Sequence, residues 1–364
     1  MQRDAALASL TEQGARWLDP AAAARWRRVV LSMLQPDEGE RLREQTRLSG
    51  QLALAEARVS LAAGEYAHAR ELLAAAQAAF EAELEPGDPL ALEQWLALVQ
   101  LELAVGDPAA ARVAGSRVVA LAEAHHHGSL LQMAALLAQA QALRADGDLA
   151  QAMALTMQAT RISTPGHSHR HDRRRGEALI LGARIAAENG DDDDAQALLT
   201  RAEAYLYDGP ERALPRLWRG VIELRRRRIP EGLAAIEDGL AIVGELDPED
   251  ARALPMLELA GRALLEADQL DSARTVLRAA VDLADRRLGM GPRQAFLLRD
   301  LGELEQRAKH PTLALDHFDR AHVMSAAALG IHHPEVVSAT LARADLAWDL
   351  DQRDYAAGLY RVLV

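Results

Sequence analysis

The feature that most constrains this chain is a set of small residues that recurs at nearly constant spacing. Seven of these residues, here called anchors, follow turn-like stretches and are separated by steps of 42, 41, 43, 37, 41 and 41 residues: Ala69, Ala111, Ala152, Ala195, Gly232, Ala273 and Ala314. An eighth anchor is expected at Ala357 or Gly358. Small residues also lie seven positions after and twelve positions before nearly every anchor, with Val118 and Val99 as exceptions.

This spacing predicts pairs of antiparallel helices. Two helices approach closely only where the residues at their crossing are small, and a residue twelve positions before an anchor lies on the preceding helix. The glycines Gly64, Gly106, Gly147 and Gly190 can end a helix, and the acidic residue after each of them can cap the next one. Abundant alanine and leucine also favour helix over strand.

We expect two segments: an N-terminal helical cap over residues 1–43 and a tandem array of about eight helix pairs over residues 44–364. The pairs are predicted near residues 44–84, 88–124, 128–162, 172–206, 211–245, 250–287, 292–328 and 334–363. The cap would cover the otherwise exposed face of the first repeat.

From about Glu44 onward, the small-residue pattern and the glycine–acid turns resemble the tetratricopeptide repeat family. The segment Leu329-Gly330 followed by His333-Pro334 is similar to the linker of the long-period, kinesin-light-chain-like subclass found in bacterial signalling proteins. The resemblance implies a right-handed α-solenoid whose first helices line a concave groove. Heat and armadillo repeats have a similar length and are the alternative fold.

Composition excludes several functions. The chain has no cysteine, and Lys309 is its one lysine, so thiolate metal sites and a P-loop are absent. A formal charge of -13 disfavours nucleic-acid binding. No membrane-spanning segment or secretory signal is recognisable, so we expect a cytoplasmic protein without a cofactor. Arginine-rich composition suits a bacterium with a GC-rich genome.

The resemblance places groove positions on the first helices. The candidate partner-binding residues are Arg58, Gln100, Arg144, Arg184, Arg225, Arg262, Arg299 and Glu303, and the same register includes Gln141, Glu177, Glu258 and Arg307. Several arginines at such positions would suit an extended peptide that carries acidic residues. The alternative is that these side chains are simply solvated. Because Asn189 is the only asparagine, the asparagine-based peptide contacts of the family are not expected.

Two histidine clusters suggest a second hypothesis. His125–His127 and the set His167, His169 and His171 fall in successive loops between pairs, so imidazoles from both could reach one metal ion. Without a carboxylate or thiolate at fixed spacing, the simpler interpretation is two solvated polar loops.

These features predict a non-catalytic module that binds a partner protein or peptide, with its oligomeric state left open. The linker resemblance favours a regulatory or inhibitory subunit of a bacterial signalling or defence system that contains a kinase, a STAND ATPase or a caspase-like protease. The alternative is a metal-responsive sensor that uses the histidine loops.

Overall fold

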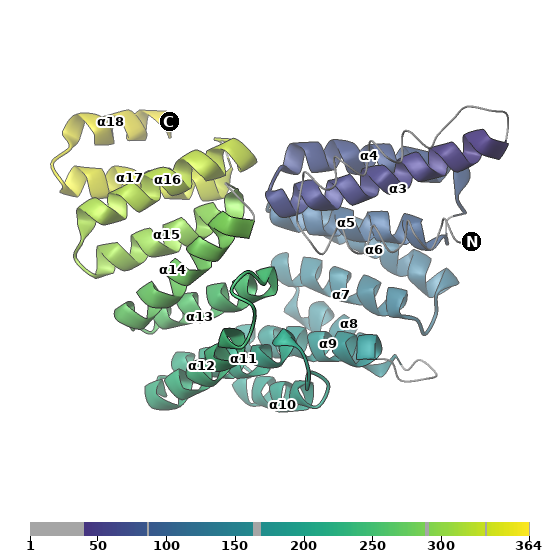
Figure 1. Cartoon of the computed structure of the whole chain (residues 1–364), viewed down its shortest axis with the longest axis horizontal. Coiled ribbons are helices and arrows are strands. Elements are labelled where there is room, and N and C mark those ends of the chain that lie inside the picture. The colour runs from purple at the N-terminus through teal and green to yellow at the C-terminus, as the bar shows by residue number, and fades with distance from the viewer. Residues whose placement is uncertain (1–39, 86, 163–168, 288–290, 332, 364) are drawn as a thin grey trace. The chain divides into compact units, whose positions relative to one another are not determined.

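The computed structural model describes residues 40–85, 87–162, 169–287, 291–331 and 333–363, and these residues form sixteen α-helices and no strand (Figure 1). The predicted all-α solenoid is therefore confirmed. Most of the expected cap, residues 1–39, lies outside the described residues. Residues 40–43, expected in the cap, belong to the first described helix.

The chain divides into two compact units, Met1–Tyr205 and Leu206–Val364. The helices of the first unit are α3 (Glu40–Ala63), α4 (Tyr66–Glu83), α5 (Pro89–Ala104), α6 (Pro108–His125), α7 (Leu130–Ala145), α8 (Leu149–Arg161), α9 (His169–Glu188) and α10 (Asp192–Glu203). Each helix packs against the next one in the chain, and the odd-numbered first helices also contact one another: α3 with α5, α5 with α7, and α7 with α9. The first helices of this unit therefore form a continuous layer.

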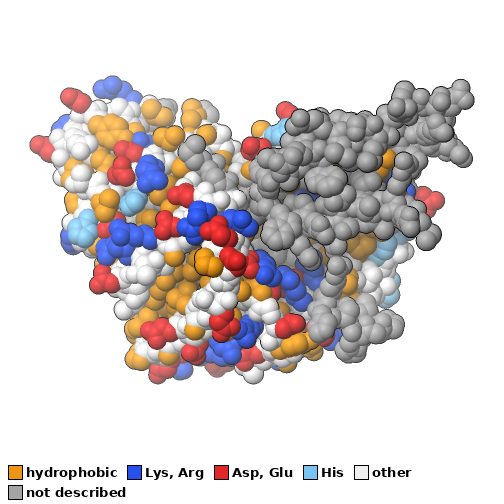
Figure 2. Space-filling view, viewed as in Figure 1, with side chains coloured by type: hydrophobic (Ala, Val, Ile, Leu, Met, Phe, Trp, Pro, Cys, Tyr) orange, Lys and Arg blue, Asp and Glu red, His pale blue; other side chains and the backbone are white. Residues whose placement is uncertain are grey.

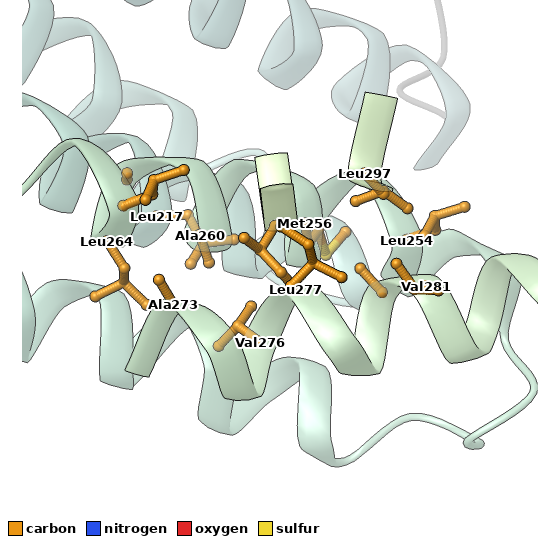
Figure 3. Packing of buried hydrophobic residues seen from close by; sticks show 14 of the residues in the cluster. Leu217, Leu254, Met256, Ala260, Leu264, Ala273, Val276, Leu277, Val281 and Leu297 are labelled. Atoms are coloured by element: carbon orange, nitrogen blue, oxygen red, sulfur yellow. The ribbon is translucent and has the colours of Figure 1, made fainter. Parts of the chain in front are cut away.

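The second unit repeats this arrangement. Its elements are the 3-10 turn η1 (Pro210–Arg212), α11 (Ala213–Arg225), α12 (Ile229–Gly244), the 3-10 turn η2 (Ala251–Ala253), α13 (Leu254–Glu266), α14 (Leu270–Arg287), α15 (Pro292–Arg307), α16 (Pro311–Leu329), α17 (Pro334–Asp349) and α18 (Arg353–Val362). Its core is continuous between repeats, because Met256 of α13, Leu277 of α14 and Leu297 of α15 belong to one cluster of buried hydrophobic residues (Figure 3).

The anchors explain how each pair closes. Every anchor is buried and is the fourth residue of its second helix, as Ala69 is in α4. The expectation of an eighth anchor at Ala357 or Gly358 is wrong, because Ala356 is the fourth residue of α18 and is 0% exposed. Ala344, twelve residues earlier, is buried as well.

The turns between paired helices follow the predicted chemistry. Gly64, Gly106, Gly147 and Gly190 all have φ between 76° and 88°, a region that glycine enters without steric cost. The side chains of Asp107 and Asp148 accept hydrogen bonds from backbone N–H groups at the start of α6 and α8, at 2.9 and 3.1 Å. Glu65 and Asp191 occupy the same position before α4 and α10 without a side-chain cap.

Candidate binding surface

The predicted groove residues all lie on first helices. In the first unit, Arg58 is on α3, Gln100 on α5, Arg144 on α7 and Arg184 on α9. In the second unit, Arg225 is on α11, Arg262 on α13, and Arg299 and Glu303 on α15. Because neighbouring first helices touch within each unit, each set lies along one layer of helices. Basic and acidic side chains lie intermingled among apolar ones on the part of the visible face that is not grey (Figure 2).

In the first unit, the groove arginines bridge neighbouring first helices. Arg58 donates from Nη2 to Glu93 Oε2 at 2.9 Å, which links α3 to α5. Arg144 donates from Nη1 to Glu188 Oε1 at 2.7 Å, which links α7 to α9. The Arg58 and Arg144 side chains keep 31% and 25% of their surface exposed. Each arginine therefore holds the next repeat while part of its side chain stays exposed to solvent.

Arg184 lies in the same electrostatic group as Arg144 and Glu188. The pKa of Arg184 is lowered to about 10, mainly by burial and also by the positive charge of Arg144, while Glu188 opposes both effects. A guanidinium with this pKa remains protonated at neutral pH. Two cations thus stand beside the carboxylate of Glu188 between α7 and α9.

In the second unit, the groove arginines Arg262 and Arg299 both hold the buried carboxylate of Asp300. Arg262 Nη2 donates to its Oδ2 at 2.8 Å, Arg299 Nη2 donates to its Oδ1 at 3.2 Å, and Asp300 is only 6% exposed. Burial alone would lower the pKa of Arg262, but the charge and hydrogen bond of Asp300 outweigh it and raise that pKa. Glu303 accepts a 2.6 Å hydrogen bond from Arg307.

Sequence reasoning missed the acidic halves of these pairs. They are Glu93, Glu188 and Asp300. In a reversed pair the missed residue is basic: Arg293 of α15 holds Glu258 of α13, a residue of the predicted register, at 2.7 and 2.8 Å. The separations of 35, 44, 38 and 35 residues are each close to one repeat. Opposite charges one repeat apart on first helices were the signal that could have found them.

Of the remaining positions in the predicted register, Glu177 is half-buried and the others are open to solvent. Gln100 and Arg225 are exposed, as is Gln141 in the same register. The surface therefore combines exposed polar side chains with partly exposed arginines that already hold carboxylates. Such arginines can exchange an internal carboxylate for one on a ligand, because the charge-assisted hydrogen bonds are of the same kind.

The histidine hypothesis is only partly within the described residues. His126 Nε2 lies 2.6 Å from the carbonyl oxygen of Gly87, so this ring is part of the contact between successive loops. His167 is outside the described residues, and the side chains of His169 and His171 are not described. Within the described part of the chain, no group of three or more histidine or acidic side chains is placed to hold a metal ion.

Comparisons with known proteins agree with this architecture. No protein-family model and no curated protein matches the sequence. Aspartyl phosphate phosphatase F from Bacillus subtilis is similar over 81% of this chain and 77% of its own, with 13% identity and a TM-score of 0.53. The apo quorum sensor NprR from B. thuringiensis is similar over 100% of this chain and 98% of its own, with 13% identity and a TM-score of 0.51.

NprR in complex with its cognate peptide NprX is also similar, over 95% of this chain and 98% of its own, with 13% identity and a TM-score of 0.50. At such identities the likeness concerns the fold. No helix among the described residues is long and apolar enough to cross a membrane. The antiparallel pairs, their buried small-residue anchors and these structural matches together show that the chain has the fold of tetratricopeptide-repeat proteins.

Proposed function

We propose that this chain is a non-catalytic interaction module that binds an extended segment of a partner protein along its first helices. The observation that carries this proposal is the row of partly exposed arginines and exposed polar residues on contacting first helices. Repeat arrays use such elongated surfaces for recognition, since successive units present the same positions at regular intervals. The structure of NprR with NprX supports the proposal, because a similar fold there holds a peptide.

The surface fits a segment that carries acidic side chains. Arg58, Arg144 and Arg262 each keep part of the side-chain surface open while holding an internal carboxylate. A ligand carboxylate would add a second charge-assisted hydrogen bond or displace a half-exposed partner such as Glu93. Asp300 is nearly fully buried and would stay in place.

We further propose that the bound partner belongs to a signalling system and that this chain regulates or inhibits it. The Leu329–Pro334 linker resembles that of repeats in bacterial signalling proteins. Two proteins of similar fold are named as a quorum sensor and an aspartyl phosphate phosphatase, which supports a signalling context.

The test is a selection of peptides from a random library displayed on phage, followed by titration of the selected peptides by fluorescence anisotropy. Arg225→Glu and the double variant Gln100→Glu, Gln141→Glu change exposed first-helix positions without touching a buried ion pair. Acidic peptides should be selected, and at least one of these variants should weaken their binding by roughly tenfold, about 1.4 kcal/mol.

Arg320→Glu is the matched control, because Arg320 is an exposed arginine on α16, a second helix. It makes the same charge change as Arg225→Glu away from the first helices. Selection of no peptide, or equal losses for the control and the first-helix variants, would overturn the proposal.

A further inference from the structure

One face of α8 carries an apolar stripe that the other described second helices lack. Leu149, Met153 and Met157 follow one another at intervals of four residues, and all three are half-buried. They lie three positions before the anchor Ala152 and one and five positions after it. Each of the other second helices in the described part of the chain has a polar residue in at least one of these positions: Arg70, Arg112, Asp192, Glu237, Arg274, Asp319 and Arg353. The stripe therefore distinguishes the third pair.

At two other junctions, an ion pair occupies the place of this stripe. An arginine one position after the anchor holds a buried glutamate nine positions before the next anchor, and the two pairs are Arg70 with Glu102 and Arg274 with Glu305. In the third pair the equivalent residues are Met153 and Ala186. An uncharged and smaller pair of side chains therefore takes this place between α8 and α9.

A groove of about 510 Å³ lies against this stripe. It is lined by α8 and α10, both second helices of the first unit, and by residues at the end of α9. Ile185 and Ala186 of α9 and Leu198 of α10 are buried, whereas Ala150 of α8 and Ala197 of α10 are exposed. The groove therefore has an apolar base and is open to solvent above it.

Charged side chains border the groove along α10. Asp191 and Asp194 lie at the start of this helix, Arg201 lies near its end, and all three residues are exposed. Carboxylates at this position favour the positive end of the helix dipole, but the Asp191 side chain does not cap α10. Asp194 and Arg201 are separated by about 10 Å along the helix axis. The end of the groove at the start of α10 is therefore acidic, and the other end is basic.

The groove has the length and the surface relief that a helix requires. Its lining extends from Leu149 to Met157 on α8 and from Asp191 to Arg201 on α10, about 12 and 15 Å along the axes, which corresponds to between two and three helical turns. Side chains four residues apart, as in the stripe, form a ridge against which the side chains of another helix pack. Methionine side chains are flexible and adapt to apolar side chains of different shapes.

We propose that this groove binds an amphipathic helix of a partner protein. Two apolar side chains one turn apart on that helix pack over Met153 and Met157, the usual mode of helix recognition by a groove. A lysine or arginine beside them forms charge-assisted hydrogen bonds with Asp191 and Asp194. The groove lies on second helices, so the site is separate from the first-helix surface and does not depend on the function proposed above.

The test selects helices from a phage-displayed library of α-helical peptides that is randomised on one face. The library is first depleted on an Ala197→Trp variant, in which an indole at an exposed position fills the groove, and is then selected on the full wild-type chain. Enriched peptides should carry two apolar residues one turn apart and a lysine or arginine in the adjacent turn. Enrichment of no peptide, or of peptides without a basic residue, would overturn the proposal.

Titration of an enriched peptide by fluorescence anisotropy then tests the shape of the site. Ala197→Trp should weaken binding by roughly tenfold or more. Ala154→Trp is the matched control, because Ala154 is an exposed alanine of α8 outside the groove, and it should leave the affinity unchanged. A proline placed between the two apolar residues of the peptide should abolish binding, since proline breaks a helix. Equal losses for the two tryptophan variants, or binding that survives the proline, would contradict the proposal.

The charge contacts have their own control. Asp191→Asn combined with Asp194→Asn should weaken binding by roughly tenfold and make it less sensitive to salt. Glu71→Gln combined with Glu123→Gln removes the same charge from exposed residues of α4 and α6 and should have no effect. Arg225→Glu, which tests the first-helix surface, should also leave this binding unchanged, so failure of one proposal is distinguishable from failure of the other. Equal effects of the two double variants, or loss of binding in Arg225→Glu, would rule out this site.

Discussion

At the scale of single residues, buried carboxylates are held by arginines from the preceding helix. Glu102 accepts hydrogen bonds of 2.6 and 2.8 Å from Arg70. Glu305, which is 1% exposed, accepts two from Arg274 at 2.9 and 3.2 Å and lies 2.8 Å from His310 Nδ1. Burial would raise the pKa of Glu305, but the hydrogen bonds from Arg274 and His310 outweigh it and lower that pKa.

We predict that the free energy of unfolding falls in two steps as the pH decreases. Burial lowers the pKa of His317 and His322 below 6.5, with Arg320 and Arg278 near the first and Arg343 near the second also disfavouring the charged ring. The unfolded chain therefore takes up protons first, and stability present above pH 6.5 is lost below it. The lowered pKa of Glu305 adds a second loss below pH 4.5.

Urea unfolding between pH 7.5 and pH 3.5 measures this dependence. A His317→Gln, His322→Gln variant should lose most of the first decline and retain the second. A stability that is constant from pH 7.5 to 5 in the wild type would contradict the assignment of these two histidines.

Gln94 yields a second residue-scale prediction. On α5, Gln94→Leu replaces a buried Nε2 donor that has no partner among the described residues by the kind of apolar side chain found at this position in other pairs. It should raise the free energy of unfolding by about 1–3 kcal/mol, measured by chemical denaturation. Gln100→Leu, at an exposed site, should change it by less than about 0.5 kcal/mol. Equal effects of the two variants would show that the Gln94 amide carries no penalty.

At the scale of helices, the close crossings depend on residues without a side chain. A Cβ atom on Gly220 of α11 would lie 2.7 Å from the Ile236 side chain and 3.0 Å from the carbonyl oxygen of Gly232, both on α12. The backbone oxygen cannot move without shifting the helix. The small-residue pattern is therefore a requirement of helix approach at this crossing.

We predict that Gly220→Ala lowers the free energy of unfolding by about 1–3 kcal/mol, the usual cost of overpacking. Gly244, at the end of α12, is the matched control because a Cβ atom there meets no atom within 4 Å. Gly244→Ala should stabilise the protein by about 0.5–1 kcal/mol, since alanine loses less backbone entropy than glycine. Thermal and urea unfolding of both variants measure the difference, and an equal response would refute the crossing argument.

The ion pair between Arg274 and the buried Glu305, which links α14 to α15, allows a further prediction. Arg274→Met on α14 removes the main partner of the buried Glu305 on α15 and should cost about 3–5 kcal/mol. Arg286→Met, on the same helix, removes an ion pair with Glu249 in which both side chains are about half exposed, at 48% and 47%. It should cost less than about 1 kcal/mol. Similar losses for the two variants, measured by urea unfolding, would contradict the importance of burial.

At the scale of the whole molecule, contacts between elements are made mainly with neighbours in the chain. Stability in such an array is approximately a sum of repeat and nearest-neighbour terms, so a local defect should stay local. Leu277, 0% exposed on α14, lies in the core of the second unit. Leu277→Ala should cost about 2–5 kcal/mol through loss of apolar contact and the resulting cavity.

Hydrogen exchange monitored by mass spectrometry measures where that cost appears. Protection should fall most strongly over α13–α15 and remain near wild type over α4–α6. Val323→Ala, at a side chain that is 67% exposed on α16, should leave both regions unchanged. A uniform loss of protection over the whole chain would show that the array unfolds as one cooperative body.

The sequence by itself determined the helical pairs and the register of seven anchors. The reason is that close helix packing admits only small residues at a crossing, so the constraint is visible as a spacing in the chain. The same argument failed for the eighth pair because Ala356, Ala357 and Gly358 are all small, and only the start of α18 at Arg353 distinguishes them.

Only the tertiary structure decided which charges meet and which polar groups are buried. Arg58 and Arg262 appear as groove residues in the sequence, but their partners Glu93 and Asp300 lie a repeat away and meet them only when the first helices pack. The unsatisfied donor of Gln94 likewise exists only because α4 and α6 enclose one side of α5. Ion pairs and desolvation depend on distances of a few ångströms, and such distances are set by packing.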